Sequence, residues 1–486
     1  MKKFISILLS IILVFACMIP AFATESESAE VSYAGEPVVV VRGFDFMGLH
    51  YEDGSPALTF TFGNIFPGVV KLLFNMMLFN EKGMVQALVD TANTLFGPIA
   101  ADHELNSLEN IFVDTYTTSM DAYPDFFDKK GRGAEEGILA TAVNSVGAEN
   151  CFFFTYDWRK SPRVLAAELN TLIETAKQET GKDKVRLVSA SMGTVVTSAY
   201  MYYYGYDSVY NCTFVSGALN GIYTIGDLFT GNILFDADML GNFLENAVSG
   251  QNVLVKTLVK LLTRGKLLGI VCNFVNSLVD EHKATVFDAG LRDSFGLAMG
   301  IWSMCPEADF DEAVEFMFGG HEDEYETVLN ELAEMRTFLF ATEDIVDGAI
   351  ARDIPVAFLS NYNKPMTPVV ARGNAQGDAV IEVYGTSFYG TAANFGETLT
   401  EEQLAGVAAE FISPDHVINA STCRYPAYTW FIKDAAHVAT QYGSDYAAFV
   451  DYLVMSDTQH TVYDNALYPR FMQEDASLAL IPAIAE

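Results

Sequence analysis

Cysteine is scarce in this chain, and its spacing is irregular. Only 6 cysteines occur in 486 residues, and Cys17 lies in the apolar N-terminal segment. The others are far apart along the chain: Cys151, Cys212, Cys272, Cys305 and Cys423. An odd, widely spaced set fits neither a disulfide framework nor a zinc site with its close ligand pairs. We expect at most one or two disulfides, with buried thiols as the default state.

Basic residues are also few. Lysine and arginine number 28 against 63 acidic residues, and the formal net charge is -35. Proteins that bind nucleic acid need a basic surface to neutralise phosphates. We therefore expect no nucleic-acid partner, and we interpret the acidic charge as a source of solubility.

No segment after the N-terminus has an apolar run long enough to suggest a membrane span. The N-terminus itself has two lysines, an apolar run over residues 4–15 and the small-residue pattern Ala21-Phe22-Ala23. This order predicts a secretory signal peptide over residues 1–23, cleaved after Ala23, followed by a flexible acidic leader over 24–36. A lipoprotein signal ending at Cys17 is the weaker alternative. We expect the mature protein outside the cytoplasm, either soluble or peripheral.

Strand and helix patterns alternate over much of the remaining chain, residues 37–486. Strands are expected at 37–41, 151–154, 185–188, 212–215, 355–359 and 429–432, and helices at 162–180 and 192–203. Strands that are apolar throughout and alternate with helices indicate a mostly parallel sheet with helices on both faces. Helical patterns interrupt this order twice, as an insertion at about 54–106 and a cap at about 221–348. The sequence thus predicts an α/β fold with an inserted helical cap.

One short segment carries the pattern of a nucleophile turn. Ser189-Ala190-Ser191-Met192-Gly193 lies between a predicted strand and a predicted helix. A sharp strand-to-helix turn needs small flanking residues, here Ser189 and Gly193, and it lifts the central serine above the sheet. We expect Ser191 to be a nucleophile of the α/β-hydrolase type, with the Met192 N–H directed at a developing oxyanion. A second oxyanion donor is expected from the early loop, at Phe44 or Asp45.

A nucleophilic serine needs a histidine base and a carboxylate that orients it. In hydrolases of this type the histidine comes last in the chain, after the acid. His437 follows the last predicted strand and is the first choice, with His460 as the alternative. For the acid, Asp415 is preferred over Asp378, and each lies in a turn-like segment beside a strand.

At two of these segments the sequence resembles the lecithin:cholesterol acyltransferase family. Tyr156-Asp157-Trp158-Arg159 followed by Ser191-Met192-Gly193 is similar to the family's signature and elbow. The resemblance implies the α/β-hydrolase fold and acyl-ester chemistry. It also favours Asp415, because Asp415-His416-Val417 is similar to the family's acid-bearing Asp-x-Val segment. Ala190, Thr194 and Arg42 depart from the family pattern, and the Asp157–Arg159 pair is expected to be a structural ion pair.

The cap suggests the class of substrate. Residues 253–279 are strongly apolar, and an apolar cap over a serine nucleophile favours acyl chains, so lipid or fatty-acyl esters are expected. Lys256, Lys260 and Arg264 recur every four residues and would allow peripheral contact with an anionic lipid surface, although a cap helix packed on the core is the preferred interpretation. The chemistry requires no cofactor, and no zinc or calcium motif is visible. A peptidase or amidase on the same fold, and a non-catalytic binding protein, are the alternatives.

Overall fold

The computed structural model describes residues 33–58, 80–126, 135–247, 266–437 and 443–484, with isolated residues between 67 and 78 and at 257 and 260. The predicted signal peptide, residues 24–32 of the predicted leader, and Lys256 and Arg264 of the basic stretch lie outside these residues. Lys260 is described and is exposed.

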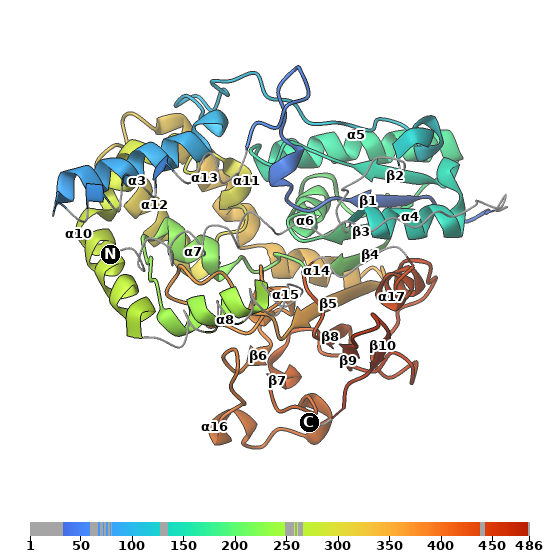
Figure 1. Cartoon of the computed structure of the whole chain (residues 1–486). Coiled ribbons are helices and arrows are strands. Elements are labelled where there is room, and N and C mark those ends of the chain that lie inside the picture. Colours follow the sequence, from blue (N-terminus) through green and yellow to red (C-terminus); the bar gives the residue numbers. More distant parts are fainter. Residues whose placement is uncertain are drawn as a thin grey trace.

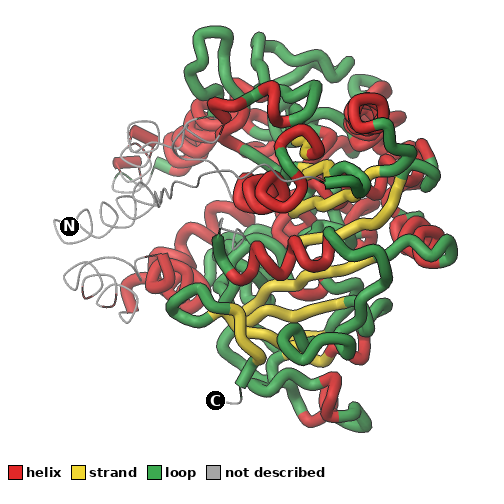
Figure 2. Tube along the Cα trace, turned by 90° about the vertical axis from the view of Figure 1, so that its right-hand side faces the viewer, coloured by secondary structure: helices red, strands yellow, loops and turns green. Residues whose placement is uncertain are grey.

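An eight-stranded sheet forms the centre of the fold, in the order β10-β9-β8-β5-β4-β3-β1-β2 (Figures 1 and 2). Every neighbouring pair is parallel except β9 with β10. The strands are β1 (Val38–Val41), β2 (Cys151–Phe154), β3 (Val185–Ala190), β4 (Val209–Val215), β5 (Val356–Tyr362), β8 (Thr429–Lys433), β9 (Phe471–Glu474) and β10 (Leu480–Pro482). The mostly parallel α/β sheet predicted from the sequence is confirmed.

Two apolar layers enclose this sheet. Alternate residues along β1 face opposite sides, with Val39 and Val41 in one core cluster and Val38 and Val40 in the other. Helices α5 (Pro162–Thr180) and α6 (Gly193–Tyr204) contribute to the first cluster, while α4 (Glu135–Val146) and α17 (Asp445–Val454) contribute to the second. Burial on both faces explains why the strands read as continuous apolar runs.

The cap consists of helices between β4 and β5, and its described residues contain no strand. In Figure 1 most of them gather on the left of the view, beside the sheet. They are α7 (Tyr223–Phe229), α8 (Ala237–Ala247), α10 (Lys266–Gly290), α11 (Met299–Trp302), α12 (Glu307–Phe318), α13 (Glu326–Leu339) and α14 (Thr342–Ile350). Helix α3 (Glu81–Phe96), from the segment after β1, packs on α10 through Met84, Val85 and Leu278.

Short elements complete the chain. A two-stranded sheet of β6 (Thr391–Ala392) and β7 (Ile418–Asn419) lies near α15 (Val383–Thr386) and α16 (Glu401–Leu404). Single 3₁₀ turns are η1 (Phe46–Gly48), η2 (Gly97–Ile99), η3 (Met120–Ala122), η4 (Pro124–Phe126), η5 (Ala148–Asn150), η6 (Ala409–Phe411) and η7 (Ala420–Thr422).

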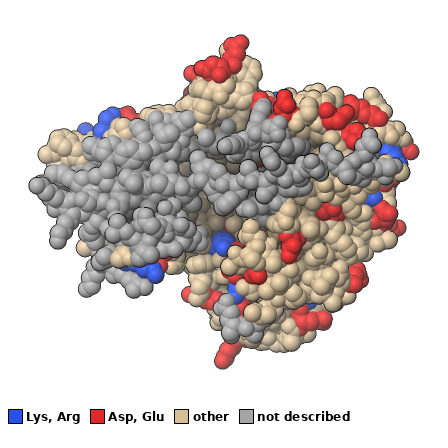
Figure 3. All heavy atoms as spheres, turned by 45° about the vertical axis from the view of Figure 1, so that its right-hand side comes forward, with Lys and Arg blue, Asp and Glu red and all other residues tan. Residues whose placement is uncertain are grey.

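The surface charge and the state of the cysteines agree with what the composition predicts. On the face shown in Figure 3, acidic side chains are spread over the described surface, whereas basic ones occur singly or in small groups. All five cysteines in the described part of the chain are buried free thiols, as the default interpretation expects. Among the described helices, none is both long and apolar enough to cross a membrane.

Candidate active site

Ser191 occupies a strained turn between β3 and α6. Its φ is 54°, in the left-handed region that residues with a side chain rarely adopt. The Ser191 N–H donates to the carbonyl of Val215 at the end of β4, over 3.0 Å, which holds the turn against the next strand. Ser191 is 5% exposed, and its hydroxyl makes no hydrogen bond to another described residue. The predicted strand, turn and helix are all present at this position.

Gly193 is required by a close approach of two backbone segments. A Cβ at this position would lie 2.5 Å from the Arg42 carbonyl oxygen and 2.7 Å from that of Val41. The first residue of α6 therefore rests directly on the end of β1. This contact places Met192 beside the loop that begins at Arg42, where the second oxyanion donor was predicted.

The predicted base, His437, is paired with Asp378. The distance from His437 Nδ1 to Asp378 Oδ2 is 2.8 Å, and the His437 backbone N–H donates to the Asp378 carbonyl over 2.9 Å. Asp378 is fully buried, and its other carboxylate oxygen accepts hydrogen bonds from the N–H groups of Val380 and Ile381. The carboxylate is thus held in one orientation, as an acid that directs a histidine must be.

Asp415 is not the partner of His437, so the preference for Asp415 over Asp378 is wrong. Its carboxylate lies 3.2 Å from Lys433 Nζ and accepts hydrogen bonds from the hydroxyls of Ser413 and Tyr362. A buried lysine that needs a counter-ion explains this aspartate. The sequence did contain a signal for the aspartate that contacts His437, because Asp378-Ala379-Val380 has the same Asp-x-Val spacing and follows a glycine.

The alternative base, His460, belongs to a different group. Its ring stacks on Tyr452 at a centroid distance of 4.5 Å and lies 3.8 Å from the Asp464 carboxylate. These contacts join the last turn of α17 to the segment that follows it.

Strand order explains how the three candidate residues come to one edge of the sheet. Ser191, Asp378 and His437 follow β3, β5 and β8, respectively, and these strands are parallel members of one sheet. The carboxyl ends of parallel strands meet at the same edge, where ligands of open α/β sheets bind. A side chain contact joins Asp378 to His437, whereas Ser191 shares their edge without a hydrogen bond to either.

The Tyr156–Arg159 segment holds the early loop in place. The Tyr156 hydroxyl donates to the Arg42 carbonyl over 2.9 Å, and Trp158 Nε1 donates to the Asp45 carbonyl over 2.9 Å. The rings of Phe44 and Trp158 lie 4.4 Å apart. This loop carries both residues predicted as the second oxyanion donor, and their N–H groups remain candidates beside that of Met192.

The charged residues of the same segment pair with each other. Arg159 Nε and NH2 lie 2.9 and 2.7 Å from the two carboxylate oxygens of Asp157, in a two-pronged ion pair. The expected structural role of this pair is therefore present.

The cap lies directly over the nucleophile turn. Gly300 in α11 has no room for a side chain, because a Cβ there would collide with the Trp158 carbonyl and lie 2.6 Å from the Met192 side chain. Met192 and Met299 are both buried. Helix α11 is thus close to Met192, the residue that follows the candidate nucleophile.

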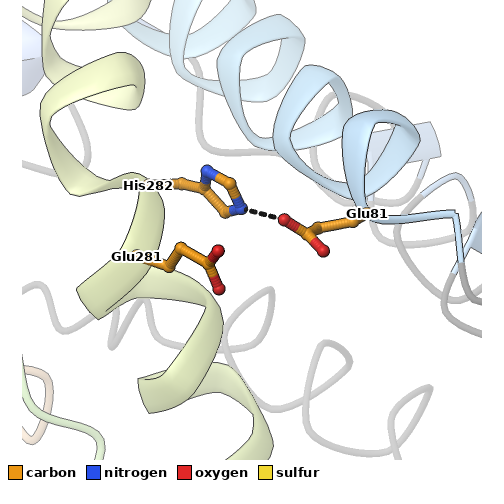
Figure 4. A group of neighbouring side chains, drawn as sticks. All are labelled: Glu81, Glu281 and His282. Atoms are coloured by element: carbon orange, nitrogen blue, oxygen red, sulfur yellow. Dashed lines mark hydrogen bonds and ion pairs between the residues drawn. The ribbon is translucent and has the colours of Figure 1, made fainter.

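Three side chains outside this site could offer ligand atoms to a metal. Glu81 on α3 and Glu281 and His282 on α10 place one ligand atom each within 4.8 Å of one another (Figure 4). His282 Nε2 and Glu81 Oε1 lie 2.7 Å apart, and both glutamates are exposed. An ion pair between the two helices accounts for this group, and it contains none of the predicted site residues.

Comparison with known proteins gives little further information. No protein-family model and no curated protein sequence matches the chain. One similar solved structure is described as the crystal structure of the Tle4-Tli4 complex, with a TM-score of 0.34 and 10% identity, covering 87% of this chain and 98% of that one. A similarity of this degree supports no statement about activity.

Proposed function

We propose that the chain is a serine hydrolase that cuts or transfers acyl groups of esters, with Ser191 as nucleophile, His437 as base and Asp378 as the orienting acid. The observation that carries the proposal is the buried Asp378–His437 pair, at the sheet edge where Ser191 sits in a strained turn. Base and orienting acid are in contact, and the nucleophile is on a turn at the same edge of the sheet.

In the proposed reaction each group has one role. His437 Nε2 takes the Ser191 proton as Oγ attacks the ester carbonyl, while Asp378 accepts a hydrogen bond from Nδ1–H and stabilises the imidazolium. The N–H of Met192, with that of Phe44 or Asp45, stabilises the oxyanion. His437 then protonates the leaving alcohol, and water or a second alcohol releases the acyl group.

Burial and the surrounding side chains support an apolar acyl chain as substrate. Helix α11 lies close to the Met192 side chain, and the early loop carries Phe44 and Phe46, whose rings pack against Trp158 in tilted and edge-on arrangements. An acyl chain gains about 0.8 kcal/mol per buried methylene in such surroundings. Lipid or fatty-acyl esters are therefore the proposed substrates. Peripheral contact with a lipid surface is compatible with this class, and the mechanism needs no cofactor.

Purified mature protein should be assayed on p-nitrophenyl esters from acetyl to palmitoyl, and on matched anilides. Turnover should favour long acyl chains and esters, and Ser191→Ala should abolish it. Ser198→Ala is the matched control, because Ser198 is a buried serine in α6 whose hydroxyl has no hydrogen-bond partner among the described residues. Faster turnover of anilides would indicate an amidase. No turnover and no labelling by a fluorophosphonate would leave a non-catalytic binding protein.

Secretion is part of the proposal and has its own test. Expression with the natural N-terminus should release a protein beginning at Thr24, as read by N-terminal sequencing. Retention of residues 1–23 in the isolated protein would refute cleavage at this site.

A further inference from the structure

A buried carboxylate directly follows the turn that carries Asp378. Glu382 is 1% exposed and is the N-cap residue of α15. Asp378 and Glu382 enclose a tight turn, in which the Asp378 N–H donates to the Ile381 carbonyl over 3.1 Å. The proposed mechanism gives Glu382 no role, although a buried carboxylate is costly to keep without one.

Both carboxylate oxygens of Glu382 face the start of cap helix α7. Each lies 3.1 Å from the backbone nitrogen of Tyr223, the first residue of that helix. One N–H group is thus shared between two acceptors that come from a distant part of the chain. Because this N–H has no partner within its own helix, Glu382 satisfies a donor that would otherwise be buried and unpaired.

Helix α7 is also tied to the nucleophile turn. The segment that leads into it donates from the Ala218 N–H to the Ser191 carbonyl over 3.3 Å and to Thr194 Oγ1 over 3.1 Å. Five residues later, Tyr223 meets Glu382. The chain of contacts therefore runs from Ser191 through the start of α7 to Glu382, and from there through one turn to Asp378 and His437.

We propose that Glu382 is a positioning residue, which clasps cap helix α7 to the Asp378 turn and so holds the acid and base in register with Ser191. This inference rests on the proposed function of the site. Glu382 does not touch the reacting atoms, and acts through the backbone of the turn that follows β5.

Protonation of Glu382 controls the clasp. Burial, with a smaller contribution from the nearby Asp378 carboxylate, raises the pKa of Glu382 to about 8, against hydrogen bonds from the backbone N–H groups of Glu382 and Tyr223 and the charge of Arg372. Above that pH a second negative charge appears beside Asp378 in a buried site, and this strains the Asp378 turn, because burial and repulsion by Asp378 outweigh the stronger hydrogen bond that the charged carboxylate accepts from Tyr223. The titratable and charged groups that surround this position are Asp378, Arg372, Tyr223, Tyr384 and Asp309.

Two variants, Glu382→Gln and Glu382→Ala, distinguish an effect of the clasp on catalysis from a general loss of stability. The glutamine keeps an acceptor and the side-chain volume but cannot ionise, so kcat should stay near that of the wild type at pH 6 to 7. It should persist above pH 9, where the wild-type kcat falls with an apparent pKa of about 8. The alanine should lower kcat roughly ten- to hundredfold at every pH, with KM little changed, because the acid turn is displaced.

Hydrogen exchange at the Tyr223 amide supplies a readout that needs no catalysis. Exchange should be faster in Glu382→Ala than in the wild type and near the wild-type rate in Glu382→Gln. Unchanged exchange and unchanged kcat in the alanine variant would overturn the clasp. Faster exchange in a protein that hydrolyses no ester would instead preserve the clasp and refute the proposed function. If the alanine variant does not fold, an alkaline limb that is the same in Glu382→Gln as in the wild type overturns the proposal.

Discussion

Lys433 and Asp415 form a buried ion pair at the end of β8, with 3.2 Å between Nζ and Oδ2 and side-chain exposures of 5% and 6%. A second aspartate, Asp378, meets the histidine four residues beyond the same strand. Two aspartates thus have different partners, one the lysine that ends β8 and the other the predicted base four residues later.

Replacing each aspartate by asparagine should separate the two roles. Asp378→Asn leaves His437 without its orienting acceptor, and kcat should fall by roughly 10³- to 10⁴-fold with little loss of folded protein. Asp415→Asn removes the negative charge 3.2 Å from the buried Lys433 ammonium, which should cost about 3–5 kcal/mol of stability. Its kcat per folded molecule should stay near that of the wild type. Steady-state kinetics beside urea unfolding would show this, and the opposite pattern would return Asp415 to the site.

Local sequence patterns were enough to predict most strands of the sheet, the turn at Ser191 and the choice of His437. The strands that carry Ser191 and His437 are apolar and buried on both faces, so their positions could be recognised from composition alone. The turn at Ser191 has a compact motif of small residues, and Gly193 shows why the motif needs them. Chain order then selected His437 among seven histidines.

Choice between the two aspartates depended on contacts that no local pattern records. Both lie in turns, and each has valine two residues later, so spacing does not separate them. What separates them is Lys433, a lysine at the end of an apolar strand whose buried ammonium needs a counter-ion. Burial of that lysine is a property of the folded chain, which the linear sequence does not reveal. The role of Glu382 was missed for the same reason, because its partner in α7 is about 160 residues away.

Removal of the Tyr156 hydroxyl tests how the early loop is held. Tyr156→Phe leaves the Arg42 carbonyl without this donor, and the loop that carries Phe44 should shift relative to Met192. We expect kcat to fall about tenfold or more, with KM changed little, because the shifted loop N–H would stabilise the oxyanion of the transition state less well. Tyr206→Phe is the matched control, since its hydroxyl donates to the carbonyl of Ile345 over 3.0 Å, in the cap. Equal kcat losses in the two variants would contradict a role at the oxyanion loop.

Gly193→Ala tests the close approach of α6 to β1. The added Cβ would lie 2.5 Å from the Arg42 carbonyl oxygen, and backbone atoms there cannot move aside without displacing β1. Overpacking of this kind should cost about 1–3 kcal/mol of stability, and the displaced Met192 N–H should lower kcat as well. Gly97→Ala provides the comparison, because Gly97 has an ordinary helical conformation and open space at its Cβ position. Thermal unfolding and ester kinetics should therefore change in the first variant only.

Stability should depend on pH through Glu382. Its pKa rises from 4.5 to about 8 on folding, so the native state binds this proton more tightly than the unfolded chain does. The stabilisation is complete below the unfolded pKa, is lost as pH rises from about 4.5 through about 8, and changes no further above that. Each unit of pKa shift corresponds to about 1.4 kcal/mol. Urea unfolding of the wild type and Glu382→Gln at pH 5 and pH 9 isolates this group, because all other titrations are shared. The stability of the wild type relative to the variant should be greater at pH 5 than at pH 9, and an equal difference at the two values would show that Glu382 titrates normally.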